Sequence, residues 1–125
     1  MQVSTKTLSL RKSDDGRILY GELLTEAKLT LKNAKENSLA RASLLDADNP
    51  IPYICNIKKI NTAEGDARAF MSKDTAGLSC VALVVESNGI SKIIADYALW
   101  INRPVVPTKI FTTIQSAERW AAGFA

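Results

Sequence analysis

The beginning of the chain alternates polar and apolar side chains, a pattern typical of half-buried β-strands. Residues 3–10 alternate in this way, and the candidates for the inner face are Val3, Leu8 and Leu10. The sequence Asp14-Asp15-Gly16 is a turn signal, because glycine accepts a positive φ without steric cost. Residues 18–24 therefore predict the return strand of an antiparallel hairpin.

A helical period replaces the alternation at residues 31–45. One face carries apolar or small side chains at spacings of three and four: Leu31, Ala34, Ser38, Ala42 and Leu45. Thr30 is the expected N-cap, since its hydroxyl can accept a free backbone N–H of the first turn. Two prolines within residues 46–52 favour extended geometry in the residues before them and end the helix.

Two apolar runs, residues 53–57 and 78–85, predict strands that are covered on both faces. Between these runs, Asn61 and Glu64 have the spacing of a capping box, although Asn replaces the usual Ser or Thr. We therefore expect a second helix that starts near Asn61 and ends before Gly77.

The last third predicts two further helices separated by a short strand. A third helix is indicated by the spacing of Ile90, Ile93, Ile94, Tyr97, Ala98 and Ile101. Pro104 and Pro107 then favour an extended passage into a strand at residues 108–111. Thr112 and Gln115 have capping-box spacing and predict a fourth helix that includes Trp120.

The order of these elements predicts an α/β fold. Strands and helices alternate after the initial hairpin, which implies a mixed, mostly parallel β-sheet with an N-terminal β-hairpin and about four α-helices. The 125 residues suit a single domain spanning residues 1–125.

Three segments resemble the SpoIIAA-like, STAS-type family of small bacterial domains. They are residues 29–35 at the start of the first helix, residues 81–85, and residues 101–111. The last is the most specific, with two prolines at fixed spacing followed by a Thr, a cation and an aromatic side chain. The resemblance covers roughly residues 16–120 and implies a SpoIIAA/STAS-like sandwich that acts through protein contacts.

The resemblance also implies a location for those contacts. STAS antagonists carry a phosphorylatable Ser in an Asp-Ser-Ser-Gly motif at the start of the helix after the third strand. Here that region reads Asn61-Thr62-Ala63-Glu64-Gly65, so the motif is absent and Thr62 is the only hydroxyl. The implied partner-contact or phospho-switch region is Asn61, Thr62 and Gly65. The residues themselves favour a plain helix cap at Asn61-Thr62.

Composition excludes several classes of function. The net charge of +3 comes from 16 basic and 13 acidic residues that are interspersed along the chain, so no basic stripe predicts nucleic-acid binding. No apolar run reaches the roughly 18 residues of a membrane span. The N-terminus lacks the apolar stretch of a signal peptide. Cys55 and Cys80 lie in separate apolar runs and are expected to be buried free thiols. Both observations predict a cytoplasmic protein.

Candidate chemistry is sparse, because the chain contains no histidine. The commonest general acid/base and metal ligand is therefore missing, and no metal or other cofactor is expected. An enzyme would need Tyr20, Tyr53 or Tyr97 to cluster beside a carboxylate. We expect instead a non-enzymatic protein-interaction or regulatory domain, with an unknown protein partner.

Two further interpretations stay open. By resemblance to lipid-binding relatives of this fold, the chain could carry or sense an apolar, lipid-like small molecule in a pocket between the helices and the sheet. The N-terminal strand, residues 3–12, could supply an open sheet edge for a homo-oligomer.

Overall fold

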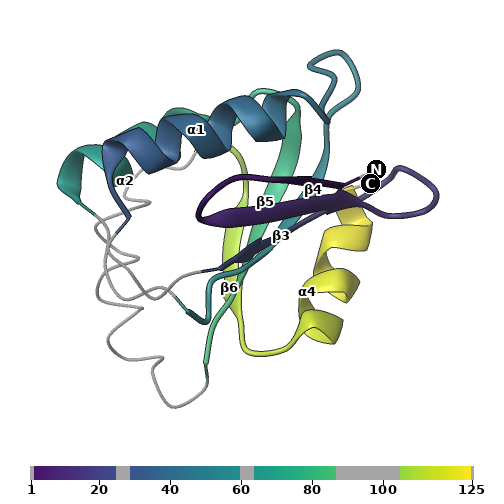
Figure 1. The fold of residues 1–125 in the computed structure, drawn as a ribbon. Helices are drawn as coiled ribbons and strands as arrows, with labels where there is room; N and C mark the ends of the chain where they lie inside the picture. The colour runs from purple at the N-terminus through teal and green to yellow at the C-terminus, as the bar shows by residue number, and fades with distance from the viewer. Residues whose placement is uncertain (1, 25–28, 60–63, 87–104, 125) are drawn as a thin grey trace.

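A computed structural model describes residues 2–24, 29–59, 64–86 and 105–124. Their core is a six-stranded sheet with α-helices on both faces (Figure 1). The strands are β1 (Gln2–Ser4), β2 (Leu8–Lys12), β3 (Leu19–Leu23), β4 (Ile51–Asn56), β5 (Leu78–Val84) and β6 (Thr108–Phe111). The helices are α1 (Leu31–Ala42), α2 (Gly65–Lys73) and α4 (Ile114–Ala121), and a 3-10 turn, η2 (Ala122–Phe124), follows α4.

The strands lie in the sheet in the order in which they occur in the chain. β1 pairs with β2 and β2 with β3 in antiparallel fashion, whereas the β3–β4, β4–β5 and β5–β6 pairs are parallel. This confirms the mixed, mostly parallel sheet with an antiparallel N-terminal hairpin.

Alternation along the central strands produces two separate cores. Tyr53 and Cys55 of β4 point into the larger core, together with Leu83 of β5 and Leu44 after α1. Ile54 points the other way, into a smaller core where Ala82, Val84, Ala117 and Ala121 pack closely. α1 and α2 therefore cover one face and α4 covers the opposite face of β4 and β5, as Figure 1 shows. Both faces of these strands are buried, as the apolar runs predicted.

The expected single strand at residues 3–10 is wrong, because a turn at residues 5–7 divides it into β1 and β2. The Thr5 hydroxyl accepts hydrogen bonds from the backbone N–H groups of Thr7 (3.3 Å) and Leu8 (3.1 Å). Side-chain hydroxyls that bond locally to the backbone compete with the strand ladder. The next turn is confirmed, with Gly16 at φ +72°.

Helix α1 confirms its predicted cap and corrects its predicted face. Thr30 accepts the Asn33 N–H at 3.1 Å, but the helix ends at Ala42, which is exposed. The buried positions of α1 are Ala34 and Asn37. The polar Asn37 is thus buried, whereas the predicted inner face included its neighbour Ser38 instead.

Helices α2 and α4 both begin later in the sequence than predicted. α2 begins at Gly65 rather than near Asn61, and its N-cap Glu64 makes no side-chain capping bond. α4 is capped by Thr113, which accepts the Ser116 N–H at 3.1 Å, one residue later than the predicted Thr112–Gln115 pair.

The described residues form three α-helices rather than about four. The helix predicted from Ile90 to Ile101 lies outside the described residues. Within the described ranges, no helix combines the length and the apolar character needed to cross a membrane.

Candidate functional site

The starts of α1 and α2 meet at the carboxyl edge of the parallel strands. α1 follows β3 and α2 follows β4, so both helices begin where these strands end. The Glu64 N–H donates to the Leu29 carbonyl oxygen at 2.9 Å, which joins the residues just before the two helices. Ligands of open parallel sheets bind outside the carboxyl ends of the strands. This edge is therefore one candidate site.

Only part of the predicted contact region can be placed at this edge. Gly65 is the first residue of α2 and is exposed. A Cβ added there would meet only the guanidinium of Arg68, at 3.6 Å. Asn61 and Thr62 lie outside the described residues. Leu24, which directly follows β3, is 40% exposed and adds apolar surface at the end of that strand.

A buried polar cluster joins α1 to the N-terminal hairpin. Asn37 Oδ1 accepts the Thr5 hydroxyl at 2.5 Å, and Asn37 Nδ2 donates to the Thr7 hydroxyl at 2.9 Å. One turn further along α1, Arg41 pairs with the Asp74 carboxylate and donates to the Asp74 carbonyl oxygen at 2.9 Å. Asn37 and Thr7 are buried, and their mutual bond gives both polar side chains a partner, so the cluster has a structural role.

The two cysteines are free and buried, as predicted. Burial raises the pKa of the Cys55 thiol to about 11 and that of the Cys80 thiol to about 11. Both thiols stay protonated at neutral pH, and the thiolate is the nucleophilic form. Neither cysteine is therefore activated for covalent catalysis.

A cavity of about 80 Å³ lies between the helices and the sheet. Polar groups of Asn37, Arg41, Tyr53 and Cys55 share its lining with apolar side chains of the larger core. Pockets that hold small molecules measure about 300–1,000 Å³. The volume here falls well short of what a lipid-like ligand requires.

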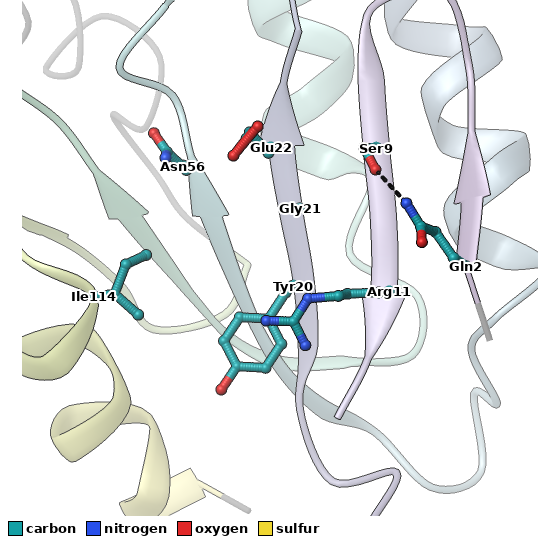
Figure 2. Close-up of a pocket in the computed structure, with 8 residues that line it drawn as sticks. All are labelled: Gln2, Ser9, Arg11, Tyr20, Gly21, Glu22, Asn56 and Ile114. Carbon is teal, nitrogen blue, oxygen red and sulfur yellow. Dashed lines mark hydrogen bonds between the residues drawn. The ribbon is translucent and has the colours of Figure 1, made fainter. Parts of the chain in front are cut away.

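A larger groove of about 310 Å³ lies on the opposite face of the sheet, beside α4. α4 packs on β4 and β5, and within the described part of the chain no helix covers the same face of β1–β3. Figure 2 shows the side chains around this opening. Its lining residues, called the polar groove below, are Gln2, Ser9, Arg11, Tyr20, Gly21, Glu22, Asn56 and Ile114.

One end of the polar groove is held in place by a tyrosine and a carboxylate. The Tyr20 hydroxyl donates to Glu118 Oε2 of α4 at 2.5 Å. Partial burial, followed by the hydrogen bond and the charge of Glu118, raises the pKa of Tyr20 to about 12. The Arg11 guanidinium lies over the Tyr20 ring, 4.3 Å from its centroid. Here a tyrosine does meet a carboxylate, but at neutral pH the phenol is a proton-bearing donor and not a base.

Comparison with known proteins identifies the family. The profile of a family described as a domain of unknown function, DUF7793, matches residues 12–125. The chain belongs to the DUF7793 family. No curated protein matches it.

The DUF7793 domain is also similar to a solved structure, an uncharacterised DUF3478 protein from Shewanella loihica PV-4 with a SpoIIAA-like fold. The match has a TM-score of 0.61 and 16% identity, and it covers 97% of this chain and 98% of that chain. The SpoIIAA/STAS-like fold predicted from residues 29–35, 81–85 and 101–111 is thereby confirmed.

Sequence reasoning did not find the polar groove of the DUF7793 domain. The signal was present, because alternation places Ser9 and Arg11 of β2 on one face with Tyr20 and Glu22 of β3. What the sequence could not show is that α4 leaves this face open while Glu118 reaches Tyr20 across 98 residues of chain. Among the described residues, no group of three or more acidic or cysteine side chains could hold a metal ion.

Proposed function

We propose that this DUF7793 domain is a non-enzymatic regulatory module that binds a protein partner at the starts of α1 and α2. The contact surface would include Asn61, Thr62 and Gly65. The observation that carries the proposal is the Glu64–Leu29 hydrogen bond, which gathers two helix starts at the carboxyl edge of the sheet. The SpoIIAA-like fold and the exposed first turn of α2 support the same location.

The chemistry of the described residues supports a binding role over a catalytic one. The chain has no histidine, and both thiols have a pKa of about 11. The tyrosine that meets a carboxylate, Tyr20, has its pKa raised to about 12. General acid–base groups work best when their pKa lies near the operating pH. None of these groups meets that condition.

Thr62 would regulate the contact if it is phosphorylated. A phosphate adds about two negative charges at pH 7 and favours the positive end of a helix. Two residues separate Thr62 from the exposed Gly65 at the start of α2. A phosphate there would alter the charge of the proposed contact surface and weaken binding to an apolar partner.

Two matched glycine substitutions test the location of the contact. Gly65 and Gly123 are both exposed, and an added Cβ would meet only Arg68 Nη2 at the first and nothing within 4 Å at the second. Both sites therefore accept Glu without backbone clash, and an acidic residue in the first turn of α2 suits the helix dipole. Gly65→Glu adds bulk and charge to the proposed surface, and Gly123→Glu adds the same at the far end of the chain.

The partner is first captured in cells of the source organism by a photo-crosslinking residue at position 65, with position 123 as control. The captured protein is then purified, and its dissociation constant is measured with the two glutamate variants. We expect Gly65→Glu to weaken binding by about 10-fold or more, as truncating or blocking a central contact does. Equal affinity of the two variants, or equal capture at the two positions, refutes the proposed surface. Peptide mapping of the captured chain by tandem mass spectrometry shows whether Thr62 carries a phosphate.

A further inference from the structure

The polar groove brings two opposite charges to one face of the N-terminal strands. In the antiparallel register of β2 and β3, Arg11 lies opposite Tyr20 and Ser9 lies opposite Glu22. Arg11 and Glu22 are therefore diagonal neighbours on the same face, a relationship that places their Cα atoms about 7–8 Å apart. Among the described residues neither one forms an ion pair. Figure 2 shows the two side chains on either side of Gly21.

The Arg11 guanidinium is positioned in advance. It lies 4.3 Å from the centroid of the Tyr20 ring, and the Tyr20 hydroxyl is anchored at 2.5 Å on Glu118 of α4. Stacking on an aromatic ring restrains a guanidinium and leaves its N–H donors free at the edge of the plane. A restrained guanidinium binds a carboxylate through two parallel hydrogen bonds.

Neutral hydrogen-bonding groups complete the rim. Asn56 Oδ1 already accepts the Lys58 N–H at 3.0 Å, which leaves Asn56 Nδ2 as a donor. On the other side, Gln2 Nε2 donates to the Ser9 hydroxyl at 3.2 Å. The volume of about 310 Å³ lies at the lower end of the range for small-molecule pockets, about 300–1,000 Å³.

We propose that the polar groove binds a small zwitterion of the amino-acid class, with its carboxylate on Arg11 and its ammonium group on Glu22. A simple anion would be repelled by Glu22 and a simple cation by Arg11, so both charges together select a molecule that carries both signs. The site lies on the opposite face of the sheet from α1 and α2. It goes beyond the proposed partner contact and can fail or succeed independently of it.

The test is a titration of the ¹⁵N-labelled full chain, followed by amide chemical shifts. The probes are the standard free amino acids, together with β-alanine and γ-aminobutyrate, which separate the two charges further. We expect at least one of them to produce saturable shifts at Arg11, Gly21 and Glu22. Two blocked forms of that probe serve as controls. The N-acetyl derivative lacks the ammonium group, and the derivative whose carboxylate is converted to a primary amide lacks the negative charge. Each should bind about 10-fold more weakly or worse, because a charge-assisted contact is lost.

Charge-removing variants assign the contacts. Arg11→Gln and Glu22→Gln should each weaken binding by about 10-fold or more. The same substitutions on the other face of the sheet, Arg68→Gln and Glu36→Gln, should leave binding unchanged. The two blocked probes test the wild-type protein directly, so the proposal stays falsifiable even if a groove variant fails to fold.

Three results would overturn the proposal. One is the absence of saturable shifts with every probe. Another is equal binding of the free and blocked probes. The third is a dimer in sedimentation velocity that Arg11→Gln dissociates, because the groove would then be an interface between two copies of the chain.

Discussion

Tyr20 and Glu118 are 98 residues apart in sequence and share a hydrogen bond of 2.5 Å. The bond joins β3 to α4 and fixes the ring on which the Arg11 guanidinium lies. Removing the hydroxyl should therefore affect both the stability of the fold and the order of the polar groove.

Tyr20→Phe keeps the ring and removes the bond to Glu118. A hydrogen bond to a charged group contributes about 1.5–3 kcal/mol, and partial exposure of this pair lowers the expected loss to about 1–2 kcal/mol. Urea denaturation of the variant and wild type measures the change in the free energy of unfolding. Gln115→Ala on the same helix is the control, because Gln115 is exposed, whereas the Ser116 hydroxyl accepts a hydrogen bond from the N-cap Thr113 at 2.8 Å. Equal stability of Tyr20→Phe and wild type contradicts the prediction.

The same bond predicts a loss of stability at alkaline pH. The pKa of Tyr20 rises from 10.0 to about 12 in the folded protein, so the unfolded chain releases this proton first. The stabilisation is fully present below pH 10 and is lost as the pH rises to about 12. The difference in unfolding free energy between wild type and Tyr20→Phe should therefore shrink across this window. A difference that stays constant, or grows, is inconsistent with the raised pKa; the comparison also cancels the contribution of Tyr53, whose pKa burial raises as well.

Gly21→Ala should be destabilising, although Gly21 lies within a strand. A Cβ at this position would lie 2.6 Å from the hydroxyl oxygen of Tyr53, which is only 6% exposed. Overpacking of this kind costs about 1–3 kcal/mol. Gly65→Ala is the matched control, because its Cβ has room and alanine favours helix, so it should be neutral or stabilising by up to about 1 kcal/mol. Thermal unfolding ranks the two variants, and the opposite ranking would show that Tyr53 moves aside freely.

Asn37→Ala should lower the stability of the fold, because it removes the central side chain of the buried polar cluster. The substitution leaves the buried Thr7 hydroxyl and the Thr5 hydroxyl without their partner on α1. An unsatisfied buried polar group costs about 1–3 kcal/mol. Glu36→Ala, one residue away and exposed, should change stability by less than about 0.5 kcal/mol. Adding Thr7→Val to Asn37→Ala should recover part of the loss, and no recovery would show that the cost comes from packing alone.

Most of the central fold could be predicted because its signals are local. The apolar runs of β4 and β5 by themselves predict strands that are buried on both faces. The position of Thr30 just before a helical period likewise predicts the N-cap of α1. The division of residues 3–10 into two strands was missed because the Thr5 hydroxyl stabilises a turn that alternation alone does not reveal. The inward position of Asn37 was missed because its partners, Thr5 and Thr7, lie in another element.

The sites depended on relationships that a sequence does not contain. The family resemblance implied a contact region at Asn61, Thr62 and Gly65, of which the structure describes only Gly65, the exposed first residue of α2. The starts of α1 and α2 are joined by the hydrogen bond between the Glu64 N–H and the Leu29 carbonyl oxygen. A bond between backbone atoms does not depend on residue type, so the sequence pattern does not reveal it. The polar groove depends on where α4 packs, and hence on the small side chains of Ala117 and Ala121 in the second core.

The most direct test of the proposed function is amide hydrogen exchange of the domain, alone and in complex with the partner captured at position 65. The contact predicts slower exchange in the complex at residues 29–33 and 64–68, where α1 and α2 begin, and unchanged exchange along α4. Protection confined to α4 or to the open face of β1–β3 would contradict the account and move the partner to the other side of the sheet.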